Sequence, residues 1–445
     1  MLRTLAAEAA RRFGQRVSFA AVRPAARPEP VQVPGPPGQA EAASESPVEA
    51  QAASESPVEA PAGTLVSPAA GWQVSYAELD RLSDEAAAGL AFRGVLPGDV
   101  VALALPSTPE FPICYLAAVK IGAIVAGLDP RWPPVVLDRL TDLLRPTVTV
   151  APFGLNVGPG PDGELIRVTP ARDSRGALAG LRRAELPPPP LPPDPARPAV
   201  IAFNSSKSSG TPRGAVFGVR QLDAIRAAEA GERWGSGVGS VLLTAVPFAH
   251  YSLMTRLPTF LQSGQTCVLM GSWRAEQVPR LAAAVQANRL SGLPAQLAEL
   301  AAQQNPPSDG LPHVEIIVSG GATTPAGLVA ALRQRFGTPV QVTYGCAEAG
   351  LGLSTYPDDL ATDVDGCVGC PMSGVTLALR DSAGHEVPRG ETGQVLLRSS
   401  ACMSGYWNDP QASTAAFTSD RFVRTGDLGR LNEEGRLVLA GPGGG

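Results

Sequence analysis

The chain has 445 residues, of which 44% are hydrophobic and 17% are charged, and its formal net charge at pH 7 is −5. This length exceeds one small core and predicts one large unit or two to three subdomains. The near-balanced charge gives no indication of nucleic-acid binding, and no apolar run reaches the roughly 20 residues that a membrane-spanning helix needs. Scattered cysteines and the lack of a signal-peptide pattern predict a reducing, cytoplasmic location.

The N-terminal region predicts a helix, a strand and then a long interruption. Apolar residues recur on one face of a helix over residues 2–13, and residues 17–22 (VSFAAV) have the composition of a strand. Residues 23–70 are mainly Pro, Ala, Glu and Ser, and residues 41–50 are repeated as 51–60 with one change. Such a segment cannot bury enough apolar surface to offset its ordering entropy, so we expect a disordered insertion.

Strands and helices alternate after this interruption. Within residues 71–186 the pattern predicts a helix that ends at Phe92, strands over 100–105 and 123–128, and a helix over 111–121. This alternation implies βαβ crossovers and a first α/β subdomain with a parallel sheet. The proline-rich residues 187–198 then predict a semi-rigid surface linker.

The second half of the chain predicts two further units. Residues 199–350 alternate again and predict a second α/β subdomain, whereas 351–445 contain short strands separated by Gly, Pro and Asp turns, such as 375–379 and 394–398. The expected fold class is therefore α/β, with two βαβ-type parallel-sheet subdomains and a small β-rich subdomain. Cys367 and Cys370 have the spacing of metal ligands, but the sequence offers no second such pair and no pair of histidines, so we do not expect a metal site there.

A loop rich in hydroxyl groups begins the second α/β region. Residues 203–214 (FNSSKSSGTPRG) directly follow the apolar run 199–202. Backbone N–H groups and hydroxyls in such a loop can point at an anion, and small side chains let phosphate oxygens approach. The loop predicts a nucleotide-binding site, with an ordinary Ser/Gly connection as the alternative.

Four more segments follow in order: 318–322 (VSGGA), 344–348 (YGCAE), 405–407 (GYW) and 424–427 (RTGD). Together with the loop they resemble the adenylate-forming (ANL) superfamily, which contains acyl-CoA synthetases, luciferases and the adenylation domains of peptide synthetases. The resemblance runs from about Gln73 to Gly441 and is nearest to the acyl-CoA synthetase type. Each motif alone is only moderately specific, but the ordered set is strong, and it implies the large N-terminal domain of that superfamily. The resemblance also implies that the segment of Cys367 and Cys370 is a turn before Pro371.

The resemblance implies that a carboxylate attacks the α-phosphorus of ATP to give an acyl-adenylate and pyrophosphate. In this comparison the loop holds the β- and γ-phosphates, and Glu348 binds Mg²⁺, a hard cation that prefers carboxylate oxygen. Adenine lies between the glycines of 320–322 and Tyr344, and Asp427 accepts hydrogen bonds from the ribose. The alternatives are a core aromatic for Tyr344 and a turn residue for Asp427. The expected nucleotide-binding residues are Ser205, Ser206, Lys207, Ser208, Ser209, Gly210, Gly320, Gly321, Ala322, Tyr344, Gly345 and Asp427.

The segment 247–250 (PFAH) resembles the acyl-CoA synthetase form, in which an aromatic residue and a histidine border the acyl pocket. His250 and Glu348 are therefore the expected catalytic residues, although His250 has a structural role as its alternative. Adenylation domains for α-amino acids usually carry an aspartate here, and none occurs between Val246 and Met254. The resemblance thus implies a fatty or aryl acid, with coenzyme A or a carrier protein as acceptor.

Three departures from the family pattern bear on activity. Lys207 replaces a glycine of the loop, and Ala347 replaces a threonine whose hydroxyl would be worth about 1.5 to 3 kcal/mol as a hydrogen bond to charge. The chain ends at 441–445, where the family's hinge leads into a C-terminal lid, so we expect no lid or a separate lid protein. The alternatives to an active ligase are a non-catalytic nucleotide- or acyl-binding pseudoenzyme that acts as a scaffold, and a gene fragment.

Overall fold

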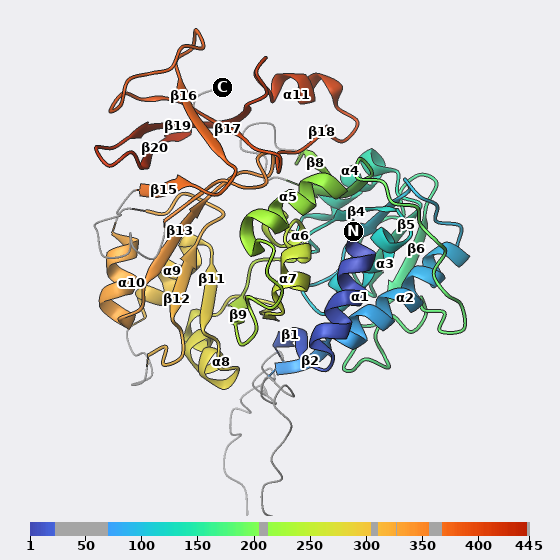
Figure 1. Cartoon of the computed structure of the whole chain (residues 1–445). Coiled ribbons are helices and arrows are strands. Elements are labelled where there is room, and N and C mark those ends of the chain that lie inside the picture. Colours follow the sequence, from blue (N-terminus) through green and yellow to red (C-terminus); the bar gives the residue numbers. More distant parts are fainter. Residues whose placement is uncertain (23–69, 204–211, 304–309, 326, 356–366, 443–445) are drawn as a thin grey trace, which may run out of the picture.

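The computed structural model describes residues 1–22, 70–203, 212–303, 310–325, 327–355 and 367–442. They form two large mixed β-sheets with helices packed around and between them (Figure 1). The predicted loop 204–211 and most of the predicted disordered insertion lie outside the described residues.

The smaller sheet has a parallel centre and antiparallel strands at one edge. Its parallel pairs join β6, β5, β3, β4 and β7, and its antiparallel pairs join β7, β8 and β18. Its strands, in spatial order, are β18 (Gly405–Tyr406), β8 (Gly214–Gly218), β7 (Pro198–Phe203), β4 (Ile124–Gly127), β3 (Val100–Leu103), β5 (Val148–Pro152) and β6 (Glu164–Val168).

The larger sheet has a parallel segment that runs from β1 through β10, β9, β11 and β12 to β13, and antiparallel pairs on both sides of it. Its strands are β16 (Thr376–Arg380), β17 (Gly393–Arg398), β19 (Val423–Leu431), β20 (Leu437–Pro442), β15 (Cys367–Pro371), β14 (Leu353–Ser354), β13 (Val340–Tyr344), β12 (Ile316–Ser319), β11 (Arg289–Gly292), β9 (Val241–Thr244), β10 (Thr266–Leu269), β1 (Val17–Val22) and β2 (Ala70–Ser75).

The helices vary in length, and the longest begins with a capping box in which Ser75 and Glu78 bond each other's backbone N–H. Figure 1 places β16 to β20 and α11 at one end of the molecule, beyond both helix-covered halves. The helices are α1 (Leu2–Phe13), α2 (Tyr76–Phe92), α3 (Glu110–Lys120), α4 (Pro134–Leu144), α5 (Val219–Ala230), α6 (Tyr251–Met254), α7 (Leu257–Ser263), the 3₁₀ turn η1 (Ala275–Gln277), α8 (Val278–Ala284), α9 (Pro294–Ala301), α10 (Leu328–Phe336) and α11 (Pro410–Ala415).

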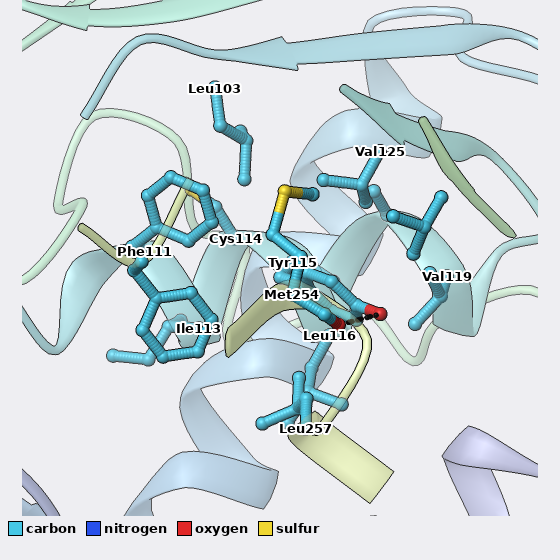
Figure 2. Close-up of a cluster of buried hydrophobic side chains, with 14 of the residues drawn as sticks. Leu103, Phe111, Ile113, Cys114, Tyr115, Leu116, Val119, Val125, Met254 and Leu257 are labelled. Carbon is cyan, nitrogen blue, oxygen red and sulfur yellow. Dashed lines mark hydrogen bonds between the residues drawn. The ribbon is translucent and has the colours of Figure 1, made fainter. Parts of the chain in front are cut away.

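The largest core forms around α3, which is buried along its whole length. Figure 2 shows its side chains packed against Met254 and Leu257, and the Tyr115 hydroxyl donates a 3.0 Å hydrogen bond to the Met254 carbonyl. Lys120, at the end of α3, is fully buried, with its Nζ 2.6 Å from Asp80 Oδ1 and 2.8 Å from Asp84 Oδ1. A buried charge persists only when it is paired, so these carboxylates fix α3 against α2.

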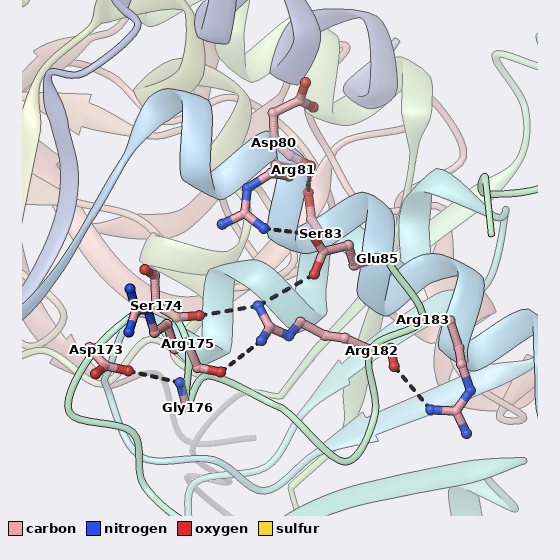
Figure 3. A network of polar contacts seen from close by, with 10 residues as sticks. All are labelled: Asp80, Arg81, Ser83, Glu85, Asp173, Ser174, Arg175, Gly176, Arg182 and Arg183. Carbon is pink, nitrogen blue, oxygen red and sulfur yellow. Dashed lines mark hydrogen bonds and ion pairs between the residues drawn. The ribbon is translucent and has the colours of Figure 1, made fainter. Parts of the chain in front are cut away.

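A polar network attaches the irregular segment 173–183 to α2 (Figure 3). Arg182 lies 3.4 Å from the Glu85 carboxylate and donates hydrogen bonds to the carbonyls of Ser174 and Arg175. This segment therefore packs against α2.

The observed elements confirm much of the predicted pattern. α1 and β1 have the predicted bounds, and β3, β4, β16, β17 and α3 differ from the predicted ranges by one or two residues at their ends. The prediction of a turn at Cys367 and Cys370 is wrong, because this segment is the strand β15, in which Gly369 has a φ of 85°. No helix within the described ranges is both long and apolar enough to cross a membrane.

The predicted division of the chain at 1–22, 23–70, 71–186, 187–198, 199–350 and 351–445 stays a proposal. Sheet membership crosses these boundaries. β7, β8 and β18 complete the sheet that β3 to β6 begin, and β1 and β2 pair at the edge of the sheet that contains β9 to β13.

Candidate functional site

The predicted site residues lie where the parallel strands of the larger sheet end. β12 ends at Ser319, and Gly320, Gly321 and Ala322 follow it; β13 ends at Tyr344, and Gly345 follows it. Because β12 and β13 are adjacent and parallel, both sets of residues reach the same edge of the sheet. In open α/β sheets ligands bind at the carboxyl ends of the strands, so this edge is the candidate site.

The two glycines after β12 keep the backbone accessible. A Cβ at Gly320 would lie 2.1 Å from the Thr343 hydroxyl oxygen, and a Cβ at Gly321 would lie 2.9 Å from Leu293 Cδ2. Gly321 also has a φ of 80°, a conformation that residues with a side chain rarely adopt. Gly321 and Ala322 are exposed, so main-chain atoms form an open surface here.

Tyr344 and Asp427 meet across 83 positions of sequence. The Tyr344 hydroxyl donates a 2.9 Å hydrogen bond to Asp427 Oδ2. Burial raises the pKa of the Tyr344 phenol, and nearby Cys346 and Asp427 add to that increase, so the phenol stays neutral and can donate. Asp427 is almost buried and follows Gly426, a residue of β19 whose φ is 75°.

Glu348 is held by a second tyrosine. The Tyr406 hydroxyl, on β18, donates a 2.7 Å hydrogen bond to Glu348 Oε1. The Glu348 side chain is almost buried, and the pKa of the Cys346 thiol is raised by burial and by this carboxylate. Ala347, between them, is buried and carries no hydroxyl. The carboxylate therefore has a fixed position at the junction of the two sheets.

His250 caps the N-terminus of α6. Its Nδ1 lies 2.7 Å from the Ser252 hydroxyl and accepts a hydrogen bond from the Ser252 backbone N–H. Burial lowers the pKa of His250 to about 4, and the positive charge of Arg256 contributes to this decrease. The imidazole is thus neutral at pH 7, and its Cε1 would lie 3.9 Å from a Cβ at Gly321.

One cavity of about 930 Å³ connects several of these groups. Its wall includes His250, Gly320, Gly321, Tyr344 and Gly345. Glu348 and Asp427 lie behind this wall, Asp427 being bonded to Tyr344 and Glu348 being close enough to Tyr251 to raise its pKa further. The structure therefore brings His250, the glycines, Tyr344, Glu348 and Asp427 to one region.

The predicted phosphate-binding loop cannot be placed in the site. Ser205, Ser206, Lys207, Ser208, Ser209 and Gly210 lie outside the described residues. Within the described ranges, no group of three or more His, Cys, Asp or Glu side chains is arranged to hold a metal ion.

The roles of Tyr251, which lines the cavity, and of Tyr406, which binds Glu348, were not predicted from the sequence. The pair formed by Arg256 and Glu229 in the cavity wall, where Arg256 Nε lies 2.6 Å from Glu229 Oε1, was not predicted either. Tyr251 and Tyr406 stand next to or inside recognised motifs, and this adjacency was the available signal. Glu229 lies in α5 and Arg256 in the turn between α6 and α7, and neither carries such a signal.

Comparisons with known proteins agree with this geometry. Residues 49–407 match the family described as AMP-binding enzyme. The chain is 26% identical to 4-coumarate–CoA ligase 5 of Oryza sativa subsp. japonica, over 84% of this chain and 72% of that protein. It is 27% identical to the fatty acid–[acyl-carrier-protein] ligase MmaC of Mycobacterium marinum, over 82% and 72%.

The fold is also found among solved structures. The N-terminal domain of FACL13 from Mycobacterium tuberculosis superposes with a TM-score of 0.75 at 19% identity, covering 98% of this chain and 99% of that domain. At this identity the likeness concerns the fold alone. The family match covers more than half of the chain, and the motif residues Tyr344, Glu348, Tyr406 and Asp427 lie together in space. The chain belongs to the AMP-binding enzyme family, within the adenylate-forming superfamily.

Proposed function

We propose that this chain binds ATP and uses it to convert a carboxylic acid into an acyl-adenylate, with release of pyrophosphate. The observation that carries the proposal is the convergence of Tyr344, Glu348 and Asp427 at the sheet edge that opens into the 930 Å³ cavity. The proposed reaction brings ATP and a carboxylic acid together, and the cavity beside these carboxylates offers a place for each of them. Membership of the AMP-binding enzyme family supports the same reaction class.

In this proposal the adenine lies on the main-chain surface of Gly320 and Gly321, with the ring of Tyr344 against it. The clash of any Cβ at Gly320 with Thr343 supports a requirement for open space at that point. Asp427 accepts hydrogen bonds from the ribose hydroxyls. A carboxylate offers about four lone-pair positions, so it can accept several hydrogen bonds, of which the bond from Tyr344 is one.

Glu348 holds Mg²⁺ together with the phosphates of the nucleotide. Mg²⁺ is commonly bound through one or two carboxylates, substrate phosphates and water, so a single fixed carboxylate is a fitting donor. The bound ion would neutralise part of the phosphate charge. The hydroxyl loop of residues 205–210, with Lys207, binds the β- and γ-phosphates in this proposal.

The acid occupies the cavity with its carboxylate near His250. A neutral imidazole at this place can donate or accept a hydrogen bond without attracting the carboxylate into an ion pair, which leaves it free to attack phosphorus. We propose a fatty or aryl acid without a free α-amino group. The acceptor of the acyl group is then a thiol, either coenzyme A or a carrier protein, as the names of the two ligases above suggest for those proteins.

The test is calorimetric titration of the purified chain with ATP and Mg²⁺. Glu348→Gln and Asp427→Asn should each weaken binding at least tenfold, because in this proposal Glu348 binds Mg²⁺ and Asp427 accepts hydrogen bonds from the ribose. Glu299→Gln, an exposed carboxylate on α9, is the matched control and should bind like the parent. Equal affinity of the parent and both site variants would refute the assignment of the nucleotide site.

The alternative function is a non-catalytic nucleotide-binding scaffold. One observation favours it: Ala347 has no hydroxyl to offer an α-phosphate. ATP binding without acid-dependent pyrophosphate release, across a panel of acids, would support this alternative. Absence of binding in the parent with recovery in Lys207→Gly would indicate that the loop lysine occupies the phosphate position.

A further inference from the structure

The cavity extends from the candidate site along the strands of the larger sheet. Its floor consists of alternate residues of β9, β11 and β13 and of the residues that follow them. The intervening residues, such as Leu243, Leu290 and Val342, are buried in the core on the other face of the sheet. Side chains of successive strand residues point to opposite faces, so the cavity lies over one defined face of the sheet.

This floor is polar over much of its length. Thr244, Ser291, Gln341 and Thr343 all line the cavity. The Gln341 amide donates to the Ser354 hydroxyl at 2.8 Å, whereas the Ser291 hydroxyl has no hydrogen-bond partner in the part of the chain that the structure describes. Across the cavity the wall contains apolar side chains, including Leu253 and Phe260. A purely hydrocarbon ligand would leave the polar floor unsatisfied.

The end of the cavity far from Gly320 carries charge. Arg289 begins β11 and Glu315 immediately precedes β12, and both line the cavity. They are neighbours, since Arg289 pairs with Ile316 and the Glu315 N–H bonds the Asn288 carbonyl. Burial lowers the pKa of Arg289, which Glu315 partly opposes. Among the described residues, the guanidinium has no hydrogen-bond or ion-pair partner within contact distance.

We propose that Arg289 and Glu315 recognise a hydroxyl group at the far end of the substrate acid. A hydroxyl can accept a hydrogen bond from the guanidinium and donate one to the carboxylate. A second carboxylate would be repelled by Glu315, and an ammonium group would be repelled by Arg289. The proposal rests on the proposed function, because it takes this cavity as the acid pocket.

The length of the pocket sets the size of the acid. The cavity-lining stretch along β11 begins at Arg289 and ends at Leu293, the residue that follows the strand. The four steps between these two residues span about 13 Å in extended chain. An acid whose carboxylate lies near His250 and Gly321 must therefore carry its hydroxyl at about this distance. An unbranched ω-hydroxy acid of ten carbons has a suitable length, and it serves as the probe.

The test compares 10-hydroxydecanoic acid, decanoic acid and decanedioic acid by calorimetric titration of the full chain, which requires no turnover. We expect the hydroxy acid to bind about tenfold more tightly than the other two acids. This ratio corresponds to the lower end of the free energy that a hydrogen bond to a charged group contributes. Arg289→Met should reduce the preference for the hydroxy acid over decanoic acid to within about twofold. The control Arg280→Met, an exposed arginine on α8, should keep it.

Equal binding of the three acids, preference for the diacid, or no binding of any of them would overturn the proposal. Pyrophosphate release with the same acids and ATP separates it from the proposed function. Release that is as efficient with decanoic acid as with the hydroxy acid would refute the hydroxyl pocket and support acid activation. Selective binding of the hydroxy acid without pyrophosphate release would refute acid activation and support the pocket.

Discussion

The contact between Tyr406 and Glu348 leads to a prediction about metal-dependent nucleotide binding. Tyr406→Phe removes only the hydroxyl that donates the 2.7 Å hydrogen bond to Glu348 Oε1. The phenyl ring can keep its place on β18, where the Tyr406 backbone pairs with Ala215 of β8. Because this bond fixes the position of Oε1, we interpret the tyrosine as a positioning residue for the carboxylate.

The magnitude follows from the burial of this carboxylate. Only 8% of Glu348 is exposed, so water cannot fully replace the lost donor. A hydrogen bond to a charged group contributes about 1.5 to 3 kcal/mol, which corresponds to a tenfold or greater loss of affinity. We expect Tyr406→Phe to weaken binding of ATP with Mg²⁺ by at least tenfold and to leave binding of ATP with a chelator unchanged within about twofold.

Calorimetric titrations with Mg²⁺ and with a chelator measure both quantities on the same protein. The control is Tyr115→Phe, which removes a hydrogen bond of similar length to the Met254 carbonyl inside the core. It should lower stability without changing either affinity. Unchanged binding of ATP with Mg²⁺ by Tyr406→Phe would show that the hydroxyl does not position the carboxylate. Tighter binding would show that the hydroxyl competes with the metal, and either result would contradict the positioning role.

Two further predictions concern the cavity wall. Gly320→Ala places a Cβ 2.1 Å from the Thr343 hydroxyl oxygen, so it should destabilise the fold by about 1 to 3 kcal/mol in urea denaturation and weaken ATP binding. Thr343→Ala in the same chain should restore part of both losses, and no restoration would contradict the steric cause. For His250, the unfolded chain binds a proton below pH 6.5 whereas the folded chain does so only near pH 4, so stability should fall as the pH falls through this window. At about 1.4 kcal/mol per pH unit the loss approaches 3 kcal/mol, and it should be absent in His250→Gln when unfolding is measured from pH 7 to 4.

The sequence predicted those parts of the fold that depend on local pattern. The apolar face of α1 and the apolar run of β1 are complete within a few residues, so both elements had the predicted bounds. β18 is only two residues long, and it forms through pairing with β8 almost 190 positions earlier. No local periodicity encodes such a pairing, and the predicted β-rich unit therefore gave no indication that it reaches the smaller sheet.

In the candidate site, too, the residues within motifs were predicted, whereas the contacts between distant motifs were not. Tyr344, Glu348 and Asp427 were each predicted from motifs, but the bond between Tyr344 and Asp427 and the bond between Tyr406 and Glu348 were not. Both join residues that are 58 or more positions apart. The roles of Ser205 to Gly210 stay predictions, since these residues lie outside the described ranges.

Arg289 illustrates the limit most clearly. Strand alternation alone places Arg289 and Ser291 on one face of β11 and Leu290 on the other. Hydrophobicity would assign the leucine face to the core, as the structure has it. What covers the other face depends on α5, α6 and α7, which enclose a cavity instead of packing directly on the sheet. An arginine at the start of a strand is ordinarily a solvated end residue, and the enclosure formed by these helices instead makes Arg289 part of a cavity wall.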